Sequence, residues 1–385
     1  MDFGLNEELV AMKEAARTFT EKEIVPHADK WDEEHHFPKD VIKKMGELGY
    51  FGCPVPEDYG GTDVGFLAQA ILCEEVSRGS SSVRVAFNTQ CLGTVVSILR
   101  HGTEEQKQKW VPDLINAEKI GCFAITEPNA GSDVLALKAT AKKDGDGYIL
   151  NGSKTWISFA SHADLAMVYA YTDRSQGSRG MSAFVVDMHS EGVSTSNLDK
   201  LGTRSSPTGE ISFEDVRLPA DALLGPEGAG VKIVFSSLNQ TRLSCASGGV
   251  GVAQACLDAS IQYCLEREQF GKQIGQFQMN QALLAEMSAE IEAARLLTYK
   301  AAWQKDQGQL GNVRETCLAK YTAGMAVTHC SEKAMRILGA YGYSTEYPVA
   351  RYYRDAILYQ IVEGTTNVQK MILAQDLLGY RKANR

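Results

Sequence analysis

The sequence predicts an α+β fold that is mainly helical and has three parts. We expect an N-terminal helical domain over residues 1–118, a middle β domain over 119–225 and a C-terminal four-helix bundle over 226–385. Three observations predict this order. Apolar residues recur at three- and four-residue spacing near both ends of the chain, whereas the period changes at about Lys119 to short β-rich runs between turn residues. The 385 residues also exceed one ordinary hydrophobic core.

The first part reads as a series of helices. Helical periodicity covers residues 7–19, 40–48 and 66–78. The run Ser80-Ser81-Ser82 offers an N-cap for a fourth helix, which we expect to continue past Leu92 toward Arg100. A fifth helix is expected to open at Thr103.

The middle part reads as a small β domain. Strands are expected at residues 120–125, 148–150, 165–171, 182–186 and 210–213, because these runs are β-rich and bounded by Gly, Asn, Asp and Ser. The segment Asp144-Gly-Asp-Gly147 has the composition of a calcium loop. An EF-hand needs an acid at its twelfth position, where Thr155 stands, so we interpret the segment as a hairpin turn.

The last part reads as four helices, the number a bundle needs. They are expected at about residues 230–266, along the stripe from Leu283 to Ala301, at 313–338 and after Gly364. The glycines of Gly248-Gly-Val-Gly251 lie within a helical pattern and follow no strand. This context disfavours a dinucleotide-binding fingerprint and favours close contact between helices.

Composition excludes several classes of partner. The net charge is -9, 23% of residues are charged and no polybasic run occurs, so neither nucleic acid nor an anionic membrane is an expected partner. No apolar run reaches the roughly 18 residues that a bilayer crossing needs, and Met1 to Leu9 lacks signal-peptide character, so we expect a cytoplasmic protein. The nine cysteines form no C-x-x-C pair, so we expect buried thiols rather than disulfides or a metal site.

One stretch, residues 352–367, combines chemistry with apolar surroundings. Glu363 is the acid in a run that contains Tyr359, Ile361 and Val362. If that run is buried, the carboxylate loses hydration and becomes a candidate general base. The alternative is a solvent-exposed glutamate at a helix entry, because Gly364 and the Thr-Thr-Asn cluster suit a turn that opens a helix.

Other segments carry ligand-binding potential. The segment from Thr126 to Asp133 leaves a strand with hydroxyls and a glycine, so it can direct donors at a ligand or form a plain turn. Trp156 can serve as a shelf for a ring system or belong to the core. Arg267 can bind a diphosphate or cap a helix.

Five motifs occur together in register: Thr126–Asp133, Trp156–Ser158, Arg267–Gly271, Leu338–Tyr343 and Val362–Thr365. Together they closely resemble the acyl-CoA dehydrogenase family, and the resemblance spans essentially the whole chain. It implies the three-domain fold already expected from the periodicity, assembly as a homotetramer and one FAD per subunit. It also implies an acyl-CoA substrate and an electron-transfer flavoprotein as the electron acceptor.

The resemblance assigns roles by position, with Glu363 as the catalytic base. Arg267, Phe270 and Gln278 are expected to reach the adenosine diphosphate part of a neighbouring subunit's FAD, with Gly339 and Gly342 alongside. The other implied FAD contacts are Phe123, Thr126, Trp156, Ser158, Thr365 and Asn367. The implied substrate contacts are Ser132, Arg242, Arg84 and Cys91.

The implied reaction is a 1,2-elimination. Glu363 removes the α proton while the β hydrogen leaves as hydride to flavin N5, and the Glu363 N–H and a ribityl hydroxyl bind the thioester oxygen. An acyl-CoA oxidase would share these motifs but pass electrons to oxygen. A non-catalytic flavin or acyl-CoA binding module would be expected to lack the base.

The resemblance reduces the candidate acyl groups to a few. Arg84 matches the arginine that glutaryl-CoA dehydrogenases keep for the distal carboxylate, although a surface arginine is the alternative. Val362 replaces the tyrosine of decarboxylating members, which indicates the non-decarboxylating branch. Dehydrogenases of cyclohexane-1-carboxyl-CoA and cyclohex-1-ene-1-carboxyl-CoA are also similar. The latter use an aspartate where Cys91 stands, so the retained Glu363 favours ordinary 1,2-elimination.

Overall fold

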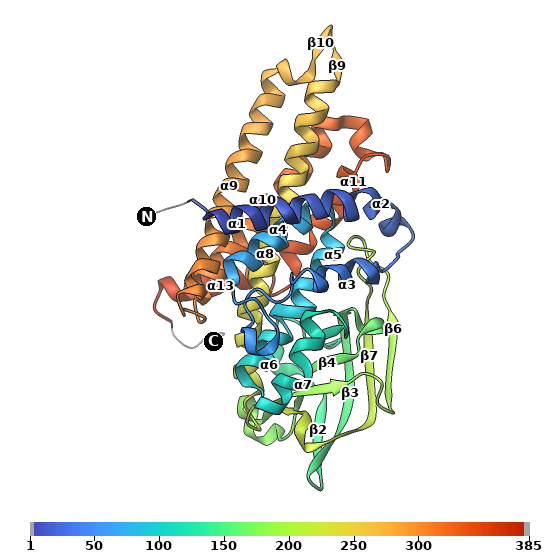
Figure 1. The fold of residues 1–385 in the computed structure, drawn as a ribbon, viewed down its shortest axis with the longest axis vertical. Helices are drawn as coiled ribbons and strands as arrows, with labels where there is room; N and C mark the ends of the chain where they lie inside the picture. The colour runs from blue at the N-terminus through green and yellow to red at the C-terminus, as the bar shows by residue number, and fades with distance from the viewer. Residues whose placement is uncertain (1–3, 381–385) are drawn as a thin grey trace.

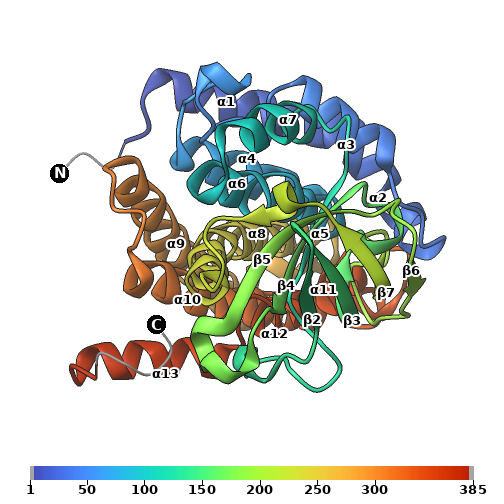
Figure 2. The same cartoon turned by 90° about the horizontal axis from the view of Figure 1, so that it is seen from below.

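The computed structural model describes residues 4–380 and confirms the three-part, mainly helical α+β fold. The sheet gathers at one end of the molecule, and a small hairpin of β9 (Glu268–Gln269) and β10 (Lys272–Gln273) forms the other (Figure 1). The helix α8 (Gly230–Glu266) lies near the centre, with the N-terminal helices, the other bundle helices and strand β5 around it (Figure 2). The predicted boundaries at 118 and 225 stay predictions, and residues 1–3 and 381–385 lie outside the described part.

The N-terminal helices follow the periodicity closely. The helix α1 spans Glu7–Phe19, α3 spans Lys39–Glu47 and α4 spans Phe66–Gly79. A π-helical turn (Thr20–Ile24) joins α1 to α2 (Val25–Glu33). The helix α7 (Glu104–Ile115) opens with a complete capping box between Thr103 and Gln106.

The helix predicted from Ser80 toward Arg100 is not continuous, which corrects the prediction. Ser80 caps α5 (Ser81–Ala86), as expected, but a π-helical turn (η3, Phe87–Leu92) follows and the chain restarts at α6 (Val95–His101). The π turn ends at Gly93, whose N–H donates to the Asn88 carbonyl oxygen, and a Cβ on Gly93 would lie 2.7 Å from the same oxygen, so the turn requires glycine there. Periodicity alone does not register such a change of pitch.

The middle domain is an eight-stranded sheet in the order β6-β7-β3-β2-β4-β5-β8, with β1 pairing in parallel to β4. All five predicted strands occur, and Asp144 and Gly147 close the β2–β3 hairpin as predicted. The missed strands β2 and β6 are largely exposed and β8 has two residues, so none gives an apolar alternation. The strands are β1 (Gly121–Ala124), β2 (Thr140–Asp144), β3 (Gly147–Ser158), β4 (Leu165–Tyr171), β5 (Met181–Asp187), β6 (Val193–Asn197), β7 (Thr208–Leu218) and β8 (Leu223–Leu224).

The predicted bundle helices are α8, α9 (Gln278–Asp306), α10 (Val313–Leu338) and α13 (Thr366–Leu377). Short helices α11 (Val349–Ala356) and α12 (Leu358–Ile361) precede the last one. The glycines of α8 permit close contact, as predicted, because a Cβ on Gly251 would lie 2.2 Å from the Glu74 carbonyl oxygen. All nine cysteines are buried free thiols, which confirms the predicted burial.

Candidate functional site

Glu363 lies in a tight turn between α12 and α13. Val362 is extended, Glu363 has φ 58° and Gly364 has φ 83°, after which Thr365 caps α13 through the N–H of Val368. The predicted turn and helix start are therefore confirmed. A left-handed backbone is unfavourable for glutamate and costs about 1–3 kcal/mol, so surrounding contacts must hold it.

Three buried side chains hold this turn by its carbonyl oxygens. Arg242 of α8 donates from Nε to the Glu363 oxygen over 3.1 Å, and Lys320 of α10 donates from Nζ to the Gly364 oxygen over 2.8 Å. Gln369 of α13 donates to both oxygens, at 3.1 and 2.9 Å. Burial lowers the pKa of Lys320. Within the described residues the Glu363 N–H donates no hydrogen bond, so it is available to a ligand.

The Glu363 carboxylate accepts hydrogen bonds at both oxygens. Asn88 of the η3 turn donates from Nδ2 to Oε1 over 2.9 Å, and Thr241 of α8 donates from Oγ1 to Oε2 over 2.5 Å. The sequence analysis assigned neither residue a role. A signal was present for Asn88, which follows Arg84 by four residues and therefore shares its helix face.

Arg84 lies in the interior and not on the surface. Its side chain is 1% exposed, its guanidinium lies 5.0 Å from the centre of the Tyr359 ring, and its Nε has no hydrogen-bond partner. The missing side chain of Gly248 makes room for it, since a Cβ there would lie 2.7 Å from Nε. No carboxylate among residues 4–380 pairs with Arg84, whose polar neighbour is the Tyr359 side chain, although arginine stays charged in proteins.

Two neighbouring side chains connect Arg84 with Glu363. Asn88, four residues after Arg84, donates to the Glu363 carboxylate. Tyr359, four residues before Glu363, contacts the Arg84 guanidinium with its ring. The two charged groups therefore border the same part of the interior.

The Cys91 side chain faces a different direction from that of Asn88 on the same turn. Its thiol lies 3.6 Å from Oε1 of Gln69 on α4, in the core of the N-terminal domain. In the described structure, the residue of this turn that contacts Glu363 is Asn88. The predicted substrate contact of Cys91 is therefore without support from its position.

The β domain brings Phe123 toward the Glu363 region and carries the other aromatic and hydroxyl groups predicted to contact FAD. A Cβ on Gly93 would lie 3.4 Å from Thr241 and 3.5 Å from Phe123, so the end of β1 reaches the Glu363 region. Trp156 lies on a bulge of β3 with φ 60° and is 59% exposed, close to Ser158. The Thr155 N–H donates to the Thr126 oxygen over 2.9 Å, which places Thr126 beside this shelf.

An exposed indole flanked by hydroxyls fits the flat, hydrogen-bonding ring system of FAD. Exposure of so large an apolar group is otherwise unfavourable, and tryptophan pairs an apolar face with a polar edge. The residues present therefore fit the cofactor that the sequence resemblance implies. Phe123, Trp156, Thr126 and Ser158 are the residues that would hold its ring end.

The loop that carries Ser132 is exposed but firmly anchored at its base. Glu127 accepts from the Ala139 N–H over 3.0 Å and from the Lys154 Nζ over 2.8 Å. Lys154 is fully buried and also donates to the Ile125 and Tyr169 oxygens, at 3.1 and 2.7 Å. Burial lowers its pKa to about 8, against the opposing effect of Glu127. Ser132 stands on the exposed part of this loop.

The predicted diphosphate contacts lie at the far end of the molecule. Phe270 is 94% exposed on the β9–β10 hairpin, opposite the sheet in Figure 1. Arg267 stacks on Tyr341, 5.5 Å from its centre, in the turn that contains Gly339 and Gly342. The remaining predicted contacts lie at helix starts: Gln278 at the exposed start of α9, Thr365 at the cap of α13 and Asn367 in its exposed first turn.

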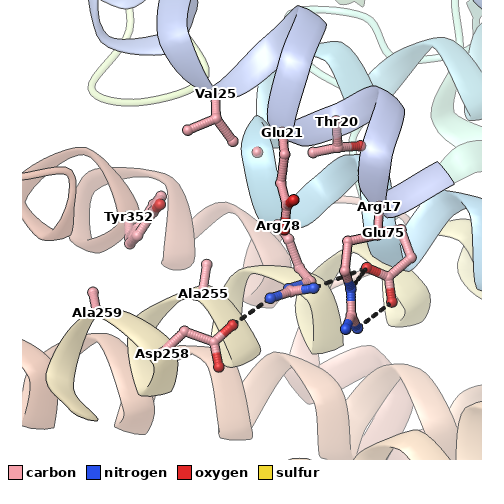
Figure 3. Close-up of a pocket in the computed structure, with 11 residues that line it drawn as sticks. Arg17, Thr20, Glu21, Val25, Glu75, Arg78, Ala255, Asp258, Ala259 and Tyr352 are labelled. Atoms are coloured by element: carbon pink, nitrogen blue, oxygen red, sulfur yellow. Dashed lines mark hydrogen bonds and ion pairs between the residues drawn. The ribbon is translucent and has the colours of Figure 1, made fainter. Parts of the chain in front are cut away.

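A separate pocket between α1, α4 and α8 contains none of the predicted site residues (Figure 3). Glu75 pairs there with Arg17 at 3.2 Å and with Arg78 at 3.0 Å, and Arg78 also pairs with Asp258 at 2.5 Å. These ion pairs tie the three helices together. The pocket therefore has a structural explanation.

The described residues include neither a candidate metal site nor a candidate membrane-spanning helix. In this part of the chain no group of three or more His, Cys, Asp or Glu side chains is placed to hold a metal ion. None of the helices between residues 4 and 380 combines the length and apolarity that crossing a membrane requires.

Comparison with known proteins gives the same family throughout. Models of the N-terminal, middle and C-terminal domains of acyl-CoA dehydrogenases match residues 6–118, 122–216 and 228–378. A glutaryl-CoA dehydrogenase of Desulfococcus multivorans is 57% identical, with 100% of both chains covered. A solved glutaryl-coenzyme A dehydrogenase complex with glutaryl-CoA superposes with TM-score 0.98 at 57% identity, covering 100% of this chain and 98% of the other.

Butyryl-CoA dehydrogenase from Megasphaera elsdenii superposes with TM-score 0.96 at 36% identity, covering 98% of this chain and all of the other. Members of the family bind FAD, and the shelf at Trp156 fits that cofactor. The chain belongs to the acyl-CoA dehydrogenase family and is an FAD-dependent oxidoreductase.

Proposed function

We propose that this enzyme oxidises glutaryl-CoA to glutaconyl-CoA and retains the distal carboxylate. The observation that carries the proposal is the buried Arg84 without a carboxylate partner. An unpaired charge in the interior is costly, so the site suits a ligand that brings the missing anion. Cyclohexane-1-carboxyl-CoA, the other candidate from the sequence, has no such anion.

Glu363 is the proposed base in this reaction. Its carboxylate removes the α proton, the β hydrogen leaves with its electron pair and a double bond forms between the two carbons. Bound FAD supplies the hydride acceptor. The unengaged Glu363 N–H can donate to the thioester oxygen as negative charge develops, an interaction that typically contributes about 3 kcal/mol.

Retention of the carboxylate follows from two side chains. Arg84 stabilises the distal carboxylate as an anion, and Val362, beside the base, offers no hydroxyl where decarboxylating members have tyrosine. The similarity to the named glutaryl-CoA dehydrogenases supports glutaryl-CoA as the substrate.

A panel of acyl-CoA substrates with a dye acceptor tests the proposal. Glutaryl-CoA should be turned over faster than butyryl-CoA and cyclohexane-1-carboxyl-CoA, and the product should be glutaconyl-CoA. Preferred turnover of the cyclic thioester contradicts the substrate assignment, and crotonyl-CoA with carbon dioxide contradicts retention. Glu363→Gln should keep FAD but abolish bleaching of the flavin; bleaching that persists would refute the base.

We further infer a homo-oligomer, expected to be a tetramer, that passes electrons to an electron-transfer flavoprotein. The exposed Phe270 at the hairpin tip, together with Arg267, supports the first inference, because these residues can reach FAD only across a subunit contact. Phe270→Ser should lower the mass measured by light scattering and the FAD content together. Peroxide formed during turnover would instead indicate an oxidase.

A further inference from the structure

The further inference concerns Asn88, which lies on the π-helical turn η3. Its Nδ2 donates to Oε1 of Glu363 over 2.9 Å, across 275 residues of sequence. Thr241 engages the other carboxylate oxygen, so the two donors fix the plane of the carboxylate. Asn88 comes from the N-terminal domain and Thr241 from the bundle.

The π-helical turn directs Asn88 to the site and its neighbours to the core. The other five residues of the turn are buried, and Asn88 alone is half-buried. Gln90, for example, donates to the Leu114 and Lys119 carbonyl oxygens at 3.0 and 2.7 Å. Single π-helical turns often occur at functional sites, because the wider turn changes the direction of one side chain.

The amide of Asn88 has no other hydrogen-bonding role. Its buried Oδ1 has no partner in the described structure, so the contact to Glu363 is the hydrogen bond that orients the side chain. Burying an amide with only one hydrogen-bond partner is unfavourable for the stability of the fold. The arrangement is therefore better explained by its effect on Glu363 than by stability.

We propose that Asn88 is a positioning residue that holds the Glu363 carboxylate aimed at the α proton. A fixed donor keeps a reacting oxygen in the geometry that the proton transfer needs. The charged and titratable groups facing Glu363 are Arg242 and Cys245 on α8 and Lys320 on α10. Arg242 and Lys320 are hydrogen-bonded to turn carbonyl oxygens, so neither replaces Asn88 at the carboxylate.

The test uses the holoenzyme and an acyl-CoA that bleaches the wild-type flavin, with anaerobic stopped-flow rates at several substrate concentrations. Asn88→Ala should slow bleaching at saturating substrate about 10- to 100-fold, as expected for a misplaced reacting group. The substrate concentration that gives half of this maximal rate should stay close to the wild-type value, because Asn88 contacts the base and not the substrate in this proposal. Asn88→Asp, which keeps the shape of the side chain but removes the donor, should slow bleaching to a similar extent.

Thr89→Val is the matched control, because Thr89 lies on the same turn and donates to the Ala86 oxygen. It should leave the bleaching rate unchanged. With rates normalised to bound FAD, a wild-type bleaching rate at saturating substrate in both Asn88 variants overturns the inference while the proposed function stands. The inference rests on Glu363 as the base, so a wild-type flavin that no acyl-CoA bleaches would refute both.

Discussion

Replacing Arg84 by methionine should reduce activity and increase stability at the same time. In the proposed complex with glutaryl-CoA the guanidinium pairs with the distal carboxylate, and truncating one partner of a buried pair costs about 2–5 kcal/mol. This loss corresponds to a decrease of roughly 30- to 5000-fold in kcat/KM for glutaryl-CoA. Without substrate the same cation has no carboxylate partner, contacts the Tyr359 side chain and is 1% exposed, so methionine should stabilise the free enzyme by about 1–4 kcal/mol.

The assay compares dye reduction with glutaryl-CoA and with butyryl-CoA, and thermal melting of the substrate-free holoenzyme. Activity on butyryl-CoA should change much less, because it places no anion at Arg84. Arg78→Met is the control, since Arg78 is paired with Glu75 and Asp258 and its loss should lower stability without changing the preference between substrates. Equal losses on both substrates, or a lower melting temperature for Arg84→Met, would refute the reasoning.

Three further predictions concern residues around the site. Lys320→Met removes a donor to the Gly364 oxygen, so flavin bleaching measured by stopped flow should slow about 10-fold at unchanged FAD content. An unchanged bleaching rate would contradict the role of Lys320 in holding the Glu363 turn. Burial lowers the pKa of Lys305 to about 7, below its unfolded value, so its destabilising effect is full below pH 7 and fades toward pH 10.5. In urea unfolding, the free energy of unfolding of the wild type should rise over that pH range. Lys305→Met should be more stable than the wild type at pH 7 and should not show this rise. Parallel pH curves for the two proteins would contradict the predicted pKa shift of Lys305. Gly251→Ala places a Cβ 2.2 Å from the Glu74 carbonyl oxygen, so the free energy of unfolding in urea should fall by about 1–3 kcal/mol. An unchanged free energy of unfolding would show that α4 and α8 can move apart.

Much of the fold was predictable because its helices carry their own periodic signal. The predicted helix 7–19 and strand 165–171 match α1 and β4 residue for residue. The failures occur where packing overrides the local pattern. The Ser80 helix changes pitch and stops at Gly93, and the polar edge strand β6 has an ordinary loop composition.

The sequence by itself determined the family and the order of the three parts, and it singled out Glu363 as the proposed base, because each depends on residues close together in the chain. Only the tertiary structure decided which side chains meet. Asn88, Thr241 and Lys320 contact the Glu363 turn from three elements distant in sequence, and no local pattern encodes such contacts. The tertiary structure also decided that Arg84 is buried and has no carboxylate partner. Its burial depends on Gly248 of α8 and Tyr359 of α12, which lie against its side chain.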